Sequence, residues 1–347
     1  MSNIAKIDKN FKIDTSINKS DVRFYNARTA PFKIHGVYHE DGRFRRMPEK
    51  TAKTVSPGVH ALHANTAGGR VRFRTNSPYV AINAKMSAVE KMSHFALCGS
   101  AGFDLYVNGN YVHTFRPPFD VSDGYESVAD GLGDGMKDIL INFPLYSDVN
   151  ELYIGLAEAA QVEAPVAYRI EKPIVYYGSS VTQGGCASRP GTAYQGFVSR
   201  ELDADFINLG FSGSAYAEKE IYDYIKTLDM SVFVMDYDYN ATRIDYLEAT
   251  HEKMFSAIRE AQPKLPIVLL SAPRATLSEE YQIRYEIIRT TYNNALAKGD
   301  KNVYLIKGTD LMAICGNEGT VDNTHPTDLG FFSMAQPIIA LLKDILK

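Results

Sequence analysis

The sequence predicts two domains of different class. An antiparallel β-sandwich of the jelly-roll type is expected over residues 1–168, and an α/β domain with a parallel sheet over residues 169–347. Three observations lead to this division. A chain of 347 residues is too long for one ordinary core. Apolar and polar residues alternate up to about residue 165, and after that point short apolar strands alternate with amphipathic helices.

Period-two alternation runs through the first half. In residues 69–75, Val71 and Phe73 alternate with arginines, as expected for a strand with one buried face. Three further segments alternate in the same way: 103–107, 139–143 and 152–156. The Asn108–Gly109 pair between two such runs is typical of a hairpin turn. No segment of this half has the pattern of a helix, so we expect an all-β domain.

The second half alternates apolar strands with helical stretches. The expected strands are 174–178, 206–210, 232–238, 266–273 and 303–308, and the expected helices include 217–228, 246–262 and 278–299. Strict alternation predicts a parallel sheet covered by helices on both faces. Ligands bind to such sheets beyond the carboxyl ends of the strands. Ser180, two residues after the first strand, therefore stands where chemistry is expected.

Composition argues against several function classes. The net charge is −4, and no run of Lys and Arg is long enough to follow a phosphate backbone, so we do not expect a nucleic-acid partner. The N-terminus lacks the apolar segment of a secretion signal, and no stretch approaches the about 18 to 20 apolar residues of a membrane span. We therefore predict a cytoplasmic protein with no membrane partner. The oligomeric state is left open, and a homo-oligomer is compatible with the sequence.

Metal and disulfide chemistry are not expected. Cys98, Cys186 and Cys315 contain no CxxC pair, which favours reduced thiols over a disulfide framework or a zinc site. His60 and His63 have no third ligand near them in the sequence. We predict no metal and no cofactor.

Groups suited to acyl transfer follow several of the expected strands. A serine attacks a carbonyl when a base takes its proton, another group orients that base, and hydrogen-bond donors stabilise the oxyanion. Ser180 follows the first strand, Gly213 lies in the loop after the second, and Asn240 follows the third. Asp322 and His325 lie three residues apart before the terminal helix. These side chains are predicted to meet at one edge of the sheet.

The order of these groups resembles a known family. The blocks G-x-S-x-T-x-G, N-L-G-x-S-G, an Asn after the third strand and D-x-x-H-P resemble the SGNH branch of the GDSL-type esterases, over about residues 172–347. The segment AGFDLYVNG at 101–109 resembles the GxDLY motif of the N-terminal domain in one subfamily. The resemblance implies a three-layer, flavodoxin-like SGNH hydrolase domain with carboxylic ester hydrolase activity.

The resemblance also implies roles for individual residues. Ser180 would be the nucleophile, His325 the general base and then acid, and Asp322 the group that orients the imidazole. The oxyanion hole would consist of the backbone N–H groups of Ser180 and Gly213 and the side chain of Asn240.

Two positions depart from the family pattern. Ser179 stands where the family name has Asp, and Asp238 stands where Gly usually precedes the Asn by two residues. We expect altered packing near the nucleophile and no loss of activity. Asp238, Tyr239 and Arg189 are candidates for contact with the substrate, although Arg189 is as well suited to pairing with a carboxylate.

The leading hypothesis is removal of O-acetyl groups from carbohydrates through an acyl-enzyme on Ser180. A β-sandwich followed by an SGNH domain resembles bacterial carbohydrate esterases of this kind, and the substrate would be an acetylated oligosaccharide or a small ester. The alternatives are a short-chain lipid or thioester hydrolase, an acyltransferase and, from another class, a carbohydrate-binding protein with an inactive hydrolase fold. The intact set of Ser180, Asp322 and His325 argues against the last alternative.

Overall fold

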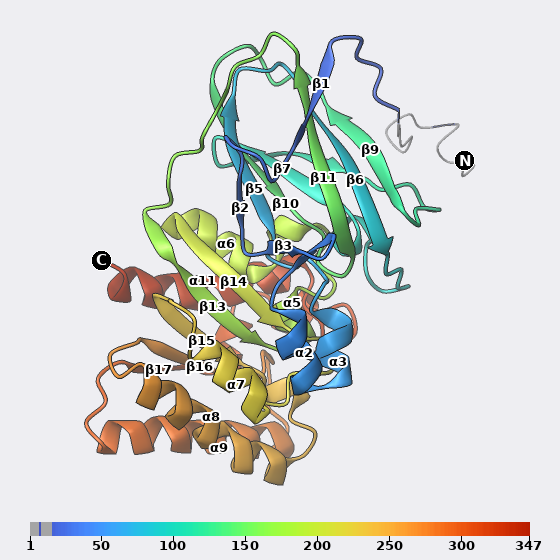
Figure 1. Cartoon of the computed structure of the whole chain (residues 1–347). Helices are drawn as coiled ribbons and strands as arrows, with labels where there is room; N and C mark the ends of the chain where they lie inside the picture. Colours follow the sequence, from blue (N-terminus) through green and yellow to red (C-terminus); the bar gives the residue numbers. More distant parts are fainter. Residues whose placement is uncertain (1–6, 8–15) are drawn as a thin grey trace.

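The computed structural model describes residue 7 and residues 16–347. Figure 1 shows two parts, with antiparallel sheets from the first half of the chain above a parallel sheet and its helices from the second half. Both predicted architectures are therefore present. Most of the N-terminal segment that was expected to lack a secretion signal lies outside the described residues. No helix in the described part combines the length and apolar character needed to cross a membrane.

The first half folds into two antiparallel sheets. One has the order β1–β11–β6–β9, formed by β1 (Val22–Asn26), β6 (Val80–Ala88), β9 (Gly124–Ala129) and β11 (Asp148–Ala157). The other has the order β12–β5–β10–β7–β8 with β2 beside β5, formed by β2 (Lys33–His35), β5 (Arg70–Thr75), β7 (Phe103–Val107), β8 (Asn110–Phe115), β10 (Lys137–Asn142) and β12 (Val162–Glu163).

The two sheets share one core. Val71 and Phe73 of β5, which the alternation assigned to the buried face, pack in the same core as Ile82 of β6. Asn108 and Gly109 form the β7–β8 turn and have φ angles of 49° and 78°, so the predicted hairpin is confirmed. The jelly-roll type stays a prediction.

Short helices interrupt the first half, and the expectation of no helix there is wrong. They are α2 (Glu49–Val55), α3 (Pro57–Leu62) and α4 (Leu97–Ser100), and a small hairpin, β3 (Tyr38–Glu40) with β4 (Arg43–Arg45), precedes them. Elements of four to seven residues are too short to show a helical period. Ala52, Val55 and Val59 are buried in a core of the second half, beside Tyr177. The helices α2 and α3 therefore pack with the parallel domain. The predicted domain boundary at residue 168 stays a prediction.

The second half contains the predicted parallel sheet, in the order β14–β13–β15–β16–β17. Its strands are β13 (Ile170–Gly178), β14 (Ala204–Gly210), β15 (Val232–Asp236), β16 (Ile267–Leu270) and β17 (Val303–Ile306). Its helices are α5 (Ser180–Gln183), α6 (Tyr194–Leu202), α7 (Lys219–Ile225), α8 (Ile244–Ala261), α9 (Glu279–Ala297), α10 (Gly308–Leu311) and α11 (Asp328–Ile345), with 3-10 turns η2 (Pro190–Thr192), η3 (Asp238–Asn240) and η4 (Gly316–Gly319).

The sheet is buried on both faces. In β13, Val175 and Tyr177 lie in one core, whereas Ile174 and Tyr176 lie in the other. This alternation places one layer of helices on each side, as predicted. The first strand of the domain, β13, lies between the second and the third, which is the flavodoxin-like order. Ser180 follows β13 and so lies at the point where the chain changes direction across the sheet, the usual position of a ligand site.

Candidate active site

The turn after β13 presents Ser180 at the start of α5. Ser179 caps this helix, because its hydroxyl oxygen accepts a hydrogen bond from the N–H of Val181 at 3.2 Å. Asp and Ser are both good N-cap residues, so the departure of Ser179 from the family pattern preserves the cap. Gly178 is required before it, since a Cβ there would lie 2.2 Å from the carbonyl oxygen of Asp236.

Three side chains that the sequence singled out lie in hydrogen-bonding contact. The hydroxyl oxygen of Ser180 is 2.9 Å from Nε2 of His325, and Nδ1 of His325 is 2.7 Å from Oδ2 of Asp322. A carboxylate only accepts hydrogen bonds, so the proton of the neutral imidazole resides on Nδ1. Nε2 is then free to accept the proton of Ser180. The arrangement can therefore activate a serine hydroxyl.

Backbone donors hold Asp322 in its charged form. Its Oδ1 accepts hydrogen bonds from the N–H groups of His325 at 2.7 Å and Thr324 at 3.0 Å. Burial alone would raise the pKa of Asp322, but these hydrogen bonds and the neighbouring imidazole outweigh it and lower the pKa below its ordinary value. The carboxylate is therefore ionised at neutral pH and stabilises positive charge on His325.

The predicted oxyanion donors Gly213 and Asn240 lie in a loop and a turn that a hydrogen bond joins to each other. We call residues 211–215 the oxyanion loop. Within it Gly213 has a φ of 63°, and a Cβ at that position would meet no atom within 4 Å. Oδ1 of Asn240 accepts a hydrogen bond from the N–H of Ala215 at 3.2 Å, so the NH₂ end of that amide is directed elsewhere and is available as a donor.

The structure gives Asp238 a different place from the predicted one. The expected strand 232–238 ends two residues early, because β15 ends at Asp236 and η3 follows. Asp238 is 2% exposed, and its carboxylate accepts hydrogen bonds from Arg284 at 2.8 Å and from the N–H of Ala272 at 2.9 Å. Asp238 is therefore a buried structural residue, and the suggestion that it contacts substrate is wrong.

Arg189 connects the two halves of the chain. Its guanidinium lies 3.0 Å from Oδ2 of Asp104 and 3.8 Å from the ring centre of Tyr111, both on the antiparallel side. The same oxygen of Asp104 accepts the N–H of Gly191 at 2.8 Å. Arg189 thus pairs with a carboxylate, one of its two expected uses, and the Asp of the GxDLY motif holds the loop that follows Ser180.

Tyr239, the third candidate for substrate contact, is half-buried. Its hydroxyl donates to the carbonyl oxygen of Pro273 at 3.0 Å, and its ring packs against Tyr281 and Arg274. Only its partly exposed ring remains to meet a substrate.

Residues of the first half also reach His325 and Ser180, which the sequence did not predict. The ring of His94 lies 5.8 Å from that of His325, and the hydroxyl of Tyr146 donates to the carbonyl oxygen of Ser180 at 3.3 Å. Both belong to loops more than 30 residues before Ser180, and only the packing of the two halves brings them there. The tyrosine of an "FPLY" segment carries no local signal of such a role.

One group of candidate metal ligands occurs among the described residues. Ligand atoms of His94, Cys186 and His325 lie within 4.8 Å of one another. Cys186 is a free cysteine, and burial together with the charge of Asp322 raises its pKa to about 12. Both ring nitrogens of His63 have other partners: Nε2 lies 2.7 Å from a guanidinium nitrogen of Arg45, and Nδ1 faces the carbonyl oxygen of His60.

Two family models cover most of the chain. Residues 171–343 match the GDSL-like lipase/acylhydrolase family, and residues 22–162 match the GxDLY domain described as the N-terminus of SGNH-hydrolase-type esterases. A comparison with curated proteins found no match.

Solved structures share the whole architecture. A candidate GDSL-like lipase from Bacteroides ovatus superposes with a TM-score of 0.83 at 28% identity, covering 94% of this chain and 98% of that one. A salicylyl-acyltransferase from a tetracycline biosynthetic pathway has a TM-score of 0.76 at 20% identity, covering 94% and 99%. A family two carbohydrate esterase from Cellvibrio japonicus has a TM-score of 0.64 at 13% identity, covering 94% and 98%.

The family matches and the geometry around Ser180 point the same way. The two matched regions, and a parallel sheet preceded by antiparallel sheets, agree with the family that the sequence resembles. The chain belongs to the GDSL-like lipase/acylhydrolase family and is a carboxylic ester hydrolase with an N-terminal GxDLY domain.

Proposed function

We propose that the chain removes O-acetyl groups from carbohydrates, with Ser180 as the nucleophile, His325 as the general base and Asp322 as the residue that orients the imidazole. The observation that carries the proposal is the continuous hydrogen-bonded series from Ser180 through His325 to Asp322, with distances of 2.9 and 2.7 Å. This is the arrangement that acyl transfer by a serine requires.

The reaction would proceed in two displacements. Nε2 of His325 takes the hydroxyl proton while Oγ of Ser180 bonds to the ester carbonyl carbon. The oxyanion that forms is stabilised by the N–H groups of Ser180 and Gly213 and the amide of Asn240. The C–O bond to the alcohol breaks, and His325 returns the proton to the departing oxygen. Water, deprotonated by His325, then attacks the acyl-enzyme, releasing acetate and regenerating Ser180.

Polar surroundings favour a hydrated substrate with a short acyl group. His94 and Asn240 bring polar side chains to this edge of the sheet. A long acyl chain gains affinity from burial of its CH₂ groups against apolar walls, whereas sugar hydroxyls need hydrogen-bonding partners. The similarity to a carbohydrate esterase from Cellvibrio japonicus agrees with this choice of substrate class.

The test compares variants on acetylated oligosaccharides, with released acetate as the readout. Ser180→Ala and His325→Ala are expected to lose nearly all turnover and labelling by a fluorophosphonate. Ser188→Ala is the matched control, since its hydroxyl in the same loop bonds to Asp328 and takes no part in the proposed chemistry. Full hydrolysis by Ser180→Ala would contradict the proposal.

Two further measurements define the substrate class. Rates on p-nitrophenyl esters are expected to fall from acetyl to octanoyl, and a rise would favour a lipid or thioester hydrolase instead. An ester product formed in the presence of an acceptor alcohol would indicate acyl transfer, because the same acyl-enzyme serves both reactions.

A further inference from the structure

We propose that Asp148, Asn65 and Gln183 form a positioning relay through which the first half of the chain aligns Ser180 with the oxyanion loop. The inference rests on the proposed function, because it assigns a purpose to contacts around the proposed nucleophile. The three side chains are buried, with exposed fractions of 6%, 4% and 0%. Hydrogen bonds among them are therefore shielded from competition with water.

Gln183 is the member of the relay that touches the proposed catalytic elements. It is the last residue of α5, the helix that begins with Ser180. Its Oε1 accepts the N–H of Ser212 in the oxyanion loop at 2.9 Å. Its Nε2 donates to Oδ1 of Asn65 at 3.1 Å and to the carbonyl oxygen of Leu145 at 3.2 Å. One side chain thus joins the nucleophile helix, the oxyanion loop and the first half.

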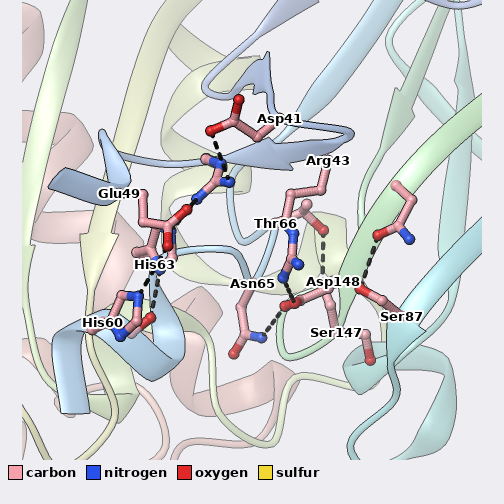
Figure 2. A network of polar contacts seen from close by, with 12 residues as sticks. Asp41, Arg43, Glu49, His60, His63, Asn65, Thr66, Ser87, Ser147 and Asp148 are labelled. Carbon is pink, nitrogen blue, oxygen red and sulfur yellow. Dashed lines mark hydrogen bonds and ion pairs between the residues drawn. The ribbon is translucent and has the colours of Figure 1, made fainter. Parts of the chain in front are cut away.

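Asn65 and Asp148 extend this connection into the antiparallel sheets. Nδ2 of Asn65 donates to Oδ1 of Asp148 at 2.9 Å, and Asp148 opens β11. Figure 2 shows Asn65 and Arg43 directed at the same carboxylate, and the guanidinium of Arg43 lies 3.4 Å from its other oxygen. Arg43, which lies in β4 of the first half, thereby helps to fix the position of the Asp148 carboxylate.

The carboxylate fixes the direction of every hydrogen bond in the relay. Asp148 only accepts, so Asn65 must present its NH₂ group to it and its oxygen to Gln183. Gln183 must then present its NH₂ group to Asn65, which leaves its oxygen for the N–H of Ser212. A flip of either amide would bring two donors or two acceptors face to face away from water. The relay therefore fixes the orientation of the Phe211–Ser212 peptide, which directly precedes the peptide that carries the N–H of Gly213.

A second polar contact between the halves provides the control. At the other end of β14, Arg70 of β5 pairs with Asp205, and His35 lies 2.9 Å from the same carboxylate. This contact joins the halves as the relay does, but it touches neither α5 nor the oxyanion loop. A variant there reports what loosening the two halves does by itself.

The experiment exchanges donor and acceptor within the relay. Asn65→Asp places two carboxylates in contact, which should push residue 65 away from Gln183 and lower kcat about tenfold, less than the 10² to 10³ for loss of an oxyanion donor, with KM changed less than about twofold. Asn65→Asp combined with Asp148→Asn restores complementary groups, because the carboxylate at position 65 then accepts from both Gln183 and the amide at position 148. The double variant should recover kcat to within about threefold of wild type.

Active-site titration with a fluorophosphonate and thermal unfolding accompany each kinetic measurement. Asp205→Asn should lower the midpoint of unfolding and leave kcat per titrated site unchanged. Gln183→Met is the second variant if Asn65→Asp does not fold, and it should lower kcat per site with KM nearly constant.

The outcomes separate the relay from the proposed function. Wild-type kcat per titrated site in Asn65→Asp or Gln183→Met, or a double variant as slow as Asn65→Asp alone, would overturn the relay while leaving Ser180 as the nucleophile. Hydrolysis by Ser180→Ala, or failure of the fluorophosphonate to label Ser180, would instead overturn the proposed function.

Discussion

The loop that carries Asp322 and the end of β15 hold their carboxylates in opposite environments, although both lie beside the candidate active site. Asp322 is 36% exposed, accepts backbone N–H groups, and has a lowered pKa. Asp236 and Asp238 are each 2% exposed, and burial raises the pKa of Asp236 to about 7. The same residue type thus serves two purposes. A solvated carboxylate with ready donors supplies charge to the proposed chemistry, whereas buried ones supply hydrogen bonds to the fold.

Removing the charge of Asp322 should have the largest effect on turnover. In Asp322→Asn the amide can donate to Nδ1 of His325 and so favour the tautomer whose Nε2 carries the proton and cannot act as a base. We expect kcat to fall by about 10⁴ with little change in stability, by analogy with the same change in serine proteases. Steady-state kinetics and urea unfolding of one preparation measure both. A loss below about tenfold would show that Asp322 does not orient the imidazole.

Breaking the buried pair at the other region should instead act on stability. Arg284→Met leaves Asp238 without its ionic partner in the interior, a change that typically costs about 3 to 5 kcal/mol. Equilibrium unfolding in urea measures this cost. Adding Asp238→Gly, the residue common in the family, removes the stranded carboxyl and should recover part of the loss. A double variant no more stable than Arg284→Met would contradict the assignment of Asp238 as a structural anion.

Asn240 lies between these two cases, because it follows the buried aspartates and yet is proposed to act on the oxyanion. Asn240→Ala should lower kcat by about 10² to 10³ if its amide is one donor among several. Asn240→Asp is the matched comparison, since it keeps the acceptor for the N–H of Ala215 but loses the donor. Equal losses in the two variants support the donor role. Near-normal kcat in Asn240→Asp would remove Asn240 from the oxyanion hole.

The same contrast separates the site residues that the sequence predicted from those that it did not. The resemblance to a family implied Ser180, Asp322 and His325 together, and the parallel sheet made their convergence plausible because the ends of its strands meet at one edge. The burial of Asp238 was not predicted, because the expected strand 232–238 runs past the end of β15 into η3. The partner of Asp238, Arg284, lies on α9, 46 residues later, and no local sequence pattern predicts that pairing.

Contacts between the halves escaped prediction for a related reason. Asn65 and Tyr146 lie in connecting segments of the first half, where neither alternation nor turn chemistry assigns them a partner. Their contacts with Gln183 and Ser180 exist only because two separately patterned domains pack together. A fold can be predicted domain by domain, whereas a site built across domains requires their relative placement.

The smallest expected effect concerns Asp236 and depends on pH. Its buried carboxyl accepts hydrogen bonds from Thr182 at 2.8 Å and Tyr194 at 3.1 Å, but desolvation dominates and its pKa rises to about 7. An unfolded Asp titrates near about 4, so between these values the folded chain binds a proton that the unfolded chain has released. The stability of the wild type should therefore fall as pH rises through this window.

Asp236→Asn removes that dependence while keeping an oxygen for Thr182 and Tyr194. Its stability relative to wild type should rise by on the order of 2 kcal/mol between pH 5 and pH 8, measured by urea unfolding at each pH. Asp322→Asn is the control, because a lowered pKa confines its own titration to more acidic pH and its difference from wild type should stay constant over this range. Parallel pH curves for Asp236→Asn and wild type would mean that Asp236, like Asp322, titrates below pH 5. The contrast between the end of β15 and the loop of Asp322 would then rest on geometry alone.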